Sequence, residues 1–359
     1  MNKIFIFIIT IFQFIQFAHA EEKWIVLTTI FYPTEALKQL VDHAEQEGWK
    51  VVVVGDKKTP KDWKYSNAIY LNPDEQKDLN YEITKHLPWN HYCRKNIGYL
   101  YAIQHGAKII YETDDDNYLL QFPYNENFPQ KINTLNSELG TVNVYHYFGQ
   151  PDIWPRGYPL DLISSSGEYW IDSKEVRVDI IQGLVNEDPD VDAIFRLTQG
   201  KEFQFSPNPP CALEKYVICP FNTQNTIFKY DAFWGLVIPS TTSQRVCDIW
   251  RGLITQRLLW EINSHLAFVA PTAFQKRNPH NLIRDFEEEI QLYLQSGKLI
   301  NTLNKWTSSQ TKIDLSIISL YECLEREKFI RQSDVILINA WISDLKKVGY
   351  TFPEIAKEN

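Results

Sequence analysis

The chain has 359 residues, of which 44% are hydrophobic and 14% aromatic, so it can bury a large core and is not a disordered polymer. The 36 Lys and Arg residues face 45 Asp and Glu residues, giving a formal net charge of −9 that repels phosphate backbones and excludes a nucleic-acid polymer as the expected partner. Its 5 cysteines show neither CxxC nor Cys/His spacing, which excludes a zinc-finger or disulfide scaffold, and their odd number leaves at least one thiol free.

Residues 1–20 have the pattern of a signal peptide. A basic residue near the start precedes an apolar run over 4–17, and an A-x-A cleavage pattern ends at Ala20. An uncleaved membrane anchor is the alternative. A bilayer span needs roughly 20 apolar residues, whereas this run is shorter and contains Gln13 and Gln16. We therefore expect cleavage after Ala20, and a membrane location only if the segment stays as an anchor.

From residue 24 to 111 the sequence predicts strands and helices in alternation. The expected strands are 24–29, 51–54, 68–71 and 108–111, and the expected helices are 37–44 and 92–104. The second strand is apolar throughout, which is typical of a strand buried on both faces of a parallel sheet. Consecutive βα units predict a doubly wound α/β sheet whose ligands bind beyond the carboxyl ends of its strands.

The later sequence predicts a more irregular middle and a helical end. Short strands are expected at 142–147, 193–197, 226–229 and 235–238, as an antiparallel extension that carries substrate loops. A helix is expected between 243 and 260, and helical periodicity from about residue 301 predicts a C-terminal helical cap. The D-x-D at 190–192 precedes one of these short strands and is interpreted as a loop.

Three adjacent carboxylates, Asp114-Asp115-Asp116, follow the strand 108–111. They repel one another, and a fold tolerates them at a buried strand end when a divalent cation or hydrogen-bond donors neutralise them. Because alternate residues of an extended segment face the same way, Asp114 and Asp116 are predicted to hold one metal ion while Asp115 points elsewhere. The alternative is a solvated acidic turn that ends the strand.

Several motifs, in order along the chain, resemble the STELLO family of glycosyltransferases. The matching stretches are 53–63, 94–108, 148–150, 154–157, 189–192, 232–236, 248–252 and 256–261. The resemblance implies a GT-A-like fold, a UDP-sugar donor with glucose as the expected sugar, dependence on Mn²⁺ (or Mg²⁺), and a glycan or protein acceptor. The acidic turn here is E-T-D-D-D-N, where plant members read closer to D-A-D-D-R.

The resemblance gives the donor side of this chain specific roles. Asp114 and Asp116 are the implied metal ligands, and the residues expected to contact the nucleotide sugar are Thr28, Thr29, Asp56, Arg94, Lys95 and Asp115. Arg94 or Lys95 would add a hydrogen-bond donor to the diphosphate, and the strand-end residues would border the uracil and ribose. Each has a structural alternative, since Arg94 fits a solvated helix start and the two threonines fit an ordinary strand.

On the acceptor side, Trp154, Trp260, Arg156 and Arg251 are the expected binding residues. Tryptophan faces stack on sugar rings, although tryptophan is also a common core residue. Asp248 and a following Q-x-x-x-W segment resemble the general-base motif and helix of processive inverting transferases, so Asp248 is the expected base. The alternative is a carboxylate favoured by a helix N-terminus. Glu261 is the competing catalytic carboxylate.

The predicted organisation is a signal peptide at 1–20, a GT-A-like α/β domain at 21–300 with a doubly wound mixed sheet, and a helical region at 301–359. The donor half of the GT-A-like domain covers about 21–120 and its acceptor half about 121–300.

The expected function is metal-dependent transfer of a hexose from a UDP-sugar, in the secretory pathway, with the Golgi lumen preferred over secretion. The alternative is a non-catalytic protein that binds a nucleotide sugar or glycan. A metal-dependent phosphohydrolase is disfavoured because the 8 histidines form no H-x-H or H-x-x-H cluster.

Overall fold

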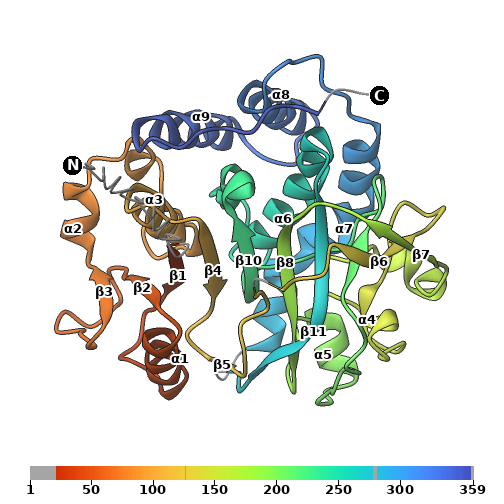
Figure 1. Cartoon of the computed structure of the whole chain (residues 1–359), viewed down its shortest axis with the longest axis horizontal. Helices are drawn as coiled ribbons and strands as arrows, with labels where there is room; N and C mark the ends of the chain where they lie inside the picture. Colours follow the sequence, from red (N-terminus) through yellow and green to blue (C-terminus); the bar gives the residue numbers. More distant parts are fainter. Residues whose placement is uncertain (1–21, 126, 278–280, 357–359) are drawn as a thin grey trace, which may run out of the picture.

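The strands join into one eleven-stranded mixed sheet with helices on both faces, in a computed structural model that describes residues 22–125, 127–277 and 281–356 (Figure 1). The strands are β1 (Lys23–Thr28), β2 (Trp49–Val54), β3 (Ala68–Leu71), β4 (Ile109–Thr113), β5 (Asn117–Leu119), β6 (Lys131–Asn136), β7 (Trp170–Glu175), β8 (Val178–Asn186), β9 (Cys211–Leu213), β10 (Asn225–Lys229) and β11 (His265–Gln275). The helices are α1 (Glu35–Gln46), α2 (Pro73–Asp78), α3 (Lys95–Gln104), α4 (Val144–Tyr147), α5 (Ala193–Thr198), α6 (Cys247–Leu259), α7 (Leu282–Lys305), α8 (Ile313–Arg326) and α9 (Gln332–Lys347).

The N-terminal half of the sheet is parallel and covered on both faces, as predicted. Its order is β3-β2-β1-β4, with β1 parallel to both β2 and β4. Alternate residues of these strands pack on α1 on one face and on α3 on the other. Gly98 lets α3 approach closely, because a Cβ there would lie 2.7 Å from methyl groups of Val26 and Val54.

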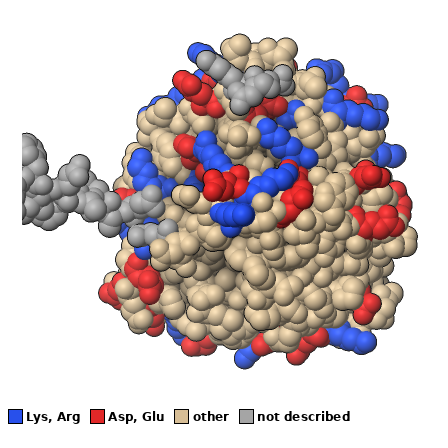
Figure 2. All heavy atoms as spheres, turned by 45° about the vertical axis from the view of Figure 1, so that its right-hand side comes forward, with Lys and Arg blue, Asp and Glu red and all other residues tan. Residues whose placement is uncertain are grey.

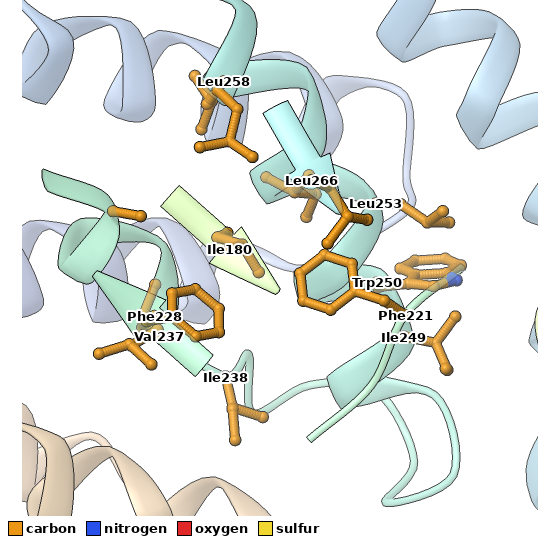
Figure 3. Close-up of a cluster of buried hydrophobic side chains, with 14 of the residues drawn as sticks. Ile180, Phe221, Phe228, Val237, Ile238, Ile249, Trp250, Leu253, Leu258 and Leu266 are labelled. Atoms are coloured by element: carbon orange, nitrogen blue, oxygen red, sulfur yellow. The ribbon is translucent and has the colours of Figure 1, made fainter. Parts of the chain in front are cut away.

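Beyond β4 the sheet becomes mixed. The antiparallel strand β10 separates β4 from the long pair β8 and β11, which are parallel to each other. Helix α6 packs on this part of the sheet, and its Ile249, Trp250 and Leu253 belong to the same buried hydrophobic cluster as Ile180 of β8 and Leu266 of β11 (Figure 3). This packing fixes the start of α6, and with it Asp248, relative to the strand ends.

The C-terminal helices α8 and α9 lie along one end of the molecule, as expected for a helical cap (Figure 1). The side chain of Asp344 in α9 accepts hydrogen bonds from the backbone N–H groups of Glu82 and Ile83, each at 2.8 Å. Trp341 donates to the carbonyl of Trp234 at 3.0 Å. The cap is therefore tied to both halves of the sheet domain. The expected domain boundary at residue 300 falls inside α7.

The predicted α/β fold class, with a mixed sheet and a helical C-terminal region, is confirmed. Three of the short strands predicted for the middle are wrong. Residues 144–147 and 193–198 are the helices α4 and α5, because Asn143 and Asp192 cap their N-termini by accepting from backbone N–H groups. Residues 235–238 end a 3₁₀ helix and continue as a loop, where the N–H of Ile238 donates to a side chain, that of Asn96.

Other features agree with the sequence or lie outside what the structure describes. All 5 cysteines are in the described part of the chain and all are free thiols. The predicted signal peptide at 1–20 lies outside the described residues. Within the described ranges, no helix combines the length and apolar character that crossing a bilayer requires.

Candidate active site

A cavity of about 340 Å³ opens where the carboxyl ends of β1, β2 and β4 meet the start of α6. Of the predicted site residues, those that line it are Thr28, Thr29, Asp56, Arg94, Asp114, Asp115, Asp116, Arg156 and Asp248. They come from both the donor and the acceptor half of the predicted domain. The tertiary structure therefore brings together side chains that lie up to about 220 residues apart in sequence, at the sheet edge where an α/β fold binds ligands.

The acidic triplet forms one wall of this cavity, and each carboxylate has its own protein partner. Asp114 accepts from the hydroxyl of Tyr92 at 2.5 Å, and Asp115 from the hydroxyl of Thr29 at 2.5 Å. Asp116 accepts from the side-chain amide of Gln275 at 3.0 Å. The triplet is therefore a set of positioned carboxylates and not a freely solvated turn.

Nearby protein cations do not balance the negative charge of these carboxylates. Burial raises the pKa of Asp114 to about 7 and that of Asp115 to about 6. The nearest cation is Lys95, whose ammonium lies 3.6 Å from Asp114, and burial lowers the pKa of this lysine. Lys95 does not line the cavity, and it donates to the carbonyl of Thr113 at 2.7 Å beneath the triplet. A divalent cation would supply the charge that the protein leaves unbalanced.

The donor set fits a hard divalent metal ion. Carboxylate oxygens are the ligands that Mg²⁺ and Mn²⁺ prefer, and Mg²⁺ is commonly held by one or two carboxylates together with substrate phosphates. Within 22–125, 127–277 and 281–356, no group of three or more His, Cys, Asp or Glu side chains is arranged to hold a metal by itself. Asp114 and Asp116 would thus share the metal with the phosphates of a bound substrate.

Asp56 and Arg94, on the donor side, line the same cavity as the acidic triplet. Asp56 is fixed at the end of β2, where its carboxylate accepts from the backbone N–H of Lys57 at 2.6 Å and of His91 at 3.2 Å. The guanidinium of Arg94 stacks on Trp89 with its central carbon 3.7 Å from the ring centroid. Arg94 is therefore a rigidly placed cation at the cavity edge and not a solvated helix start.

Arg156 joins two carboxylates, and all three side chains line the cavity. It donates to Asp248 at 3.1 and 2.9 Å and to Asp190 at 2.7 and 2.9 Å. Burial would raise the pKa of Asp190, but the Arg156 guanidinium outweighs it and lowers this pKa to about 2. All three side chains are nearly inaccessible, with 6 to 10% of each exposed. Arg156 thus orients Asp248 and keeps the Asp190 carboxylate ionised.

Four predicted acceptor or catalytic residues do not line the cavity. Glu261 pairs with Arg257 at 2.7 Å, and Trp260 packs beside the same arginine. Arg251 is buried in the core, where it pairs with Glu112 at 2.6 Å. Trp154 donates to Asp192 at 2.6 Å. The two tryptophans thus have the structural role that was their alternative, whereas Arg251 and Glu261 are held in ion pairs away from the cavity.

Sequence reasoning missed a second set of cavity residues, namely Asp190, Arg196, Asn222, Thr223, Gln224, Arg245, Gln275 and Arg277. Asp190 was predicted in a loop, and it does lie in the loop between β8 and α5, but its side chain also lines the cavity, which the loop prediction did not suggest. Arg245 stands three residues before Asp248, and Arg277 follows the end of β11. Two signals could have been used, namely the position of Asp190 in the matching stretch 189–192 and the proximity of Arg245 to Asp248.

The comparisons with known proteins identify relatives of this chain. Residues 245–359 match the family model of STELLO glycosyltransferases. An alignment of 357 residues with the probable glycosyltransferase STELLO1 of Arabidopsis thaliana is 35% identical and covers 93% of this chain and 45% of that protein. The chain is related to the STELLO family. STELLO2 of the same plant is also 35% identical, over 355 residues that cover 93% of this chain and 46% of the relative. The present chain spans less than half the length of the two plant proteins that it matches.

Two solved structures show a distant similarity to the present chain. A mycobacterial protein has a TM-score of 0.40 at 8% identity, covering 81% of this chain and 78% of that one. The glucosyl-3-phosphoglycerate synthase of M. tuberculosis has a TM-score of 0.37 at 10% identity, covering 81% and 84%. Similarity at this level carries no conclusion about function.

Proposed function

We propose that this chain is a glycosyltransferase that moves a sugar from a nucleotide-sugar donor to a glycan or protein acceptor. The observation that carries the proposal is one cavity lined by both the acidic triplet and the Arg156–Asp248 pair. The same cavity thus offers a place for a diphosphate leaving group and a carboxylate that can take a proton. The finer expectations are a UDP-hexose donor, glucose first, and Mn²⁺ or Mg²⁺ as the metal.

On the donor side, the protein groups would bind and orient the nucleotide. Asp114 and Asp116 would hold the metal, which as a Lewis acid stabilises the negative charge that develops on the diphosphate. Arg94 and Lys58 line the same cavity and add positive charge near the phosphates. Thr28 and Asp56, at the ends of β1 and β2, are placed to border the nucleoside.

On the acceptor side, Asp248 would remove the proton from the attacking hydroxyl. Arg156 holds both oxygens of this carboxylate, so the side chain has a fixed direction in the cavity. When Asp248 takes up a proton, Arg156 keeps its ion pair with Asp190 and remains in place. The guanidinium would thus preserve the geometry through the transfer step.

Calorimetric titration of UDP tests this proposal. We expect binding in the presence of Mn²⁺ or Mg²⁺ and none with EDTA, because the diphosphate would otherwise face unshielded carboxylates. Release of UDP from UDP-glucose distinguishes a transferase from the alternative of a protein that only binds the nucleotide sugar. Metal-independent binding of equal strength would contradict the proposal.

For the location we propose a lumenal compartment of the secretory pathway, the Golgi first. The support is the signal-peptide pattern at 1–20 and the need for an activated sugar, which secretory compartments import. Mass spectrometry of the protein from its native source should give an N-terminus at Glu21. Recovery of the intact 1–20 segment in a membrane fraction would instead establish an anchor.

The charges on one face of the molecule agree with a small-molecule donor rather than a nucleic-acid polymer. On the face shown in Figure 2, acidic and basic side chains are intermingled, mostly in the upper half, and no extended basic area is present on that face. This charge pattern and the net charge of −9 offer no basic surface on that face to which a polyanion could bind.

A further inference from the structure

Three arginines of the acceptor half lie together on the wall of the proposed active site. Arg196 belongs to α5, Arg245 precedes α6, and Arg277 follows β11. Each is anchored by one carboxylate, in the pairs Arg196–Asp188, Arg245–Glu289 and Arg277–Asp285. Guanidinium groups anchored in this way keep a fixed orientation, so they are ready to bind an anion at low entropic cost.

The ion pairs that anchor Arg245 and Arg277 do not use all the N–H donors of these two guanidinium groups. Arg245 holds Glu289 through Nε and Nη2, at 2.8 and 2.6 Å, which leaves Nη1 with no partner in the described part of the chain. Arg277 holds Asp285 through Nη2 at 2.9 Å, and its buried Nε has no hydrogen-bond partner among the described residues. Burial and the positive charges of Arg196 and Arg245 lower the pKa of Arg277 to about 10. An anion between these groups would satisfy the free donors and relieve the repulsion.

Two of the three arginines lie at the boundary between the active-site cavity and a neighbouring hollow of about 630 Å³, and Arg245 lines the active-site cavity alone. Arg196, Gln275 and Arg277 line both spaces. Gln275 also donates to Asp116, so the boundary begins beside the acidic triplet and leads away from it. A molecule that reaches Asp248 from the neighbouring hollow would pass Arg196 and Arg277 and enter the cavity that Arg245 lines.

We propose that Arg196, Arg245 and Arg277 form an oxyanion subsite for the acceptor, which would carry a carboxylate or a phosphate group close to the hydroxyl that receives the sugar. This inference rests on the proposed function, because the subsite serves an acceptor only if the chain is a transferase. The donor diphosphate is a poorer occupant, because its expected place is at Asp114 and Asp116, whereas all three arginines come from the acceptor half.

Titration of three simple sugars tests the subsite directly. Glucose, glucuronate and glucose 6-phosphate would each be titrated into the full chain, with and without saturating UDP and Mn²⁺. We expect at least one charged sugar to bind about tenfold or more tightly than glucose, since charge-assisted hydrogen bonds to two guanidinium groups are added. The better of the two identifies the group as carboxylate or phosphate, and added NaCl should weaken its binding.

Variants then assign the effect to these residues. R277Q should reduce the affinity for the charged sugar to that for glucose while leaving UDP affinity unchanged. R284Q is the matched control, because Arg284 is an exposed arginine of α7 paired only with Glu288 in the described structure. Should R277Q not fold, the preference of the wild-type protein for charged sugars and its salt dependence still decide the question.

The outcomes separate the subsite from the proposed function. Equal affinity for all three sugars in the wild-type protein would overturn the subsite, and so would competition between the charged sugar and UDP. Failure of UDP to bind would refute the transferase alone, since the charged sugars are also titrated without UDP.

Discussion

Replacing Asp114 and Asp116 together with asparagine should weaken Mn²⁺-dependent UDP binding at least about 100-fold. The two substitutions remove both proposed metal ligands, and each lost charge-assisted contact costs roughly 1.5 to 3 kcal/mol. Calorimetry with Mn²⁺ measures the loss directly. Asparagine keeps the shape and one acceptor oxygen at each position, so the hydrogen bonds from Tyr92 and Gln275 can persist.

The stability of this double variant separates lost binding from misfolding. Because burial raises the pKa of Asp114 to about 7, its charged form is disfavoured in the folded protein. Neutral asparagine should therefore leave Tm unchanged or higher. The matched control replaces the exposed carboxylates Asp78 and Asp152, which lie outside the cavity, and should bind UDP normally. Unchanged Mn²⁺-dependent binding in the Asp114 and Asp116 variant would refute the metal assignment.

Asp248→Asn should lower sugar transfer roughly 10²-fold or more while UDP-sugar affinity stays nearly the same. A general base typically contributes that much to the rate and little to donor binding. Both quantities are to be measured on one purified sample, turnover by UDP release with acceptor and affinity by calorimetry. Donor hydrolysis should change little if water reacts without the help of this carboxylate.

Asp190→Asn is the comparison that tests catalysis against structure, because Asp190 and Asp248 hold the same guanidinium. Each substitution removes one half of a buried ion-pair network and should cost about 1 to 3 kcal/mol of stability. If Asp248 serves only to hold Arg156, both variants will show lower Tm with normal turnover per folded molecule. Loss of turnover confined to Asp248→Asn supports the base assignment.

Glu261→Gln provides a second control for the same assignment. Glu261 was the competing catalytic carboxylate in the sequence, but it pairs with Arg257 and does not line the cavity. Transfer should remain at the wild-type rate in this variant. A large loss of turnover in Glu261→Gln, with full activity in Asp248→Asn, would reverse the two roles.

The sequence predicted the parallel half of the sheet well and the mixed half poorly. Strands β1 to β4 are short, continuous apolar runs bounded by turn residues, so local patterning identifies them. Strand β8 was missed because Gln182 interrupts its apolar run, and its amide is satisfied only by Asn222, 40 residues away. Strand β11 was missed because it contains Pro271, which the fold accommodates at an irregularity between Val269 and Ala273.

By itself, the sequence determined the fold class and the position of the acidic triplet at a strand end. These depend on the spacing of apolar residues and on the charge of neighbours in the chain, which are local properties. Only the tertiary structure decided which polar side chains share the cavity. Arg156 meets Asp190 and Asp248 across 34 and 92 residues, whereas Arg251 turns into the core toward Glu112, 139 residues away. Both arginines follow the same rule, that a buried charge must find a partner, and the packing of distant elements chooses which partner it meets.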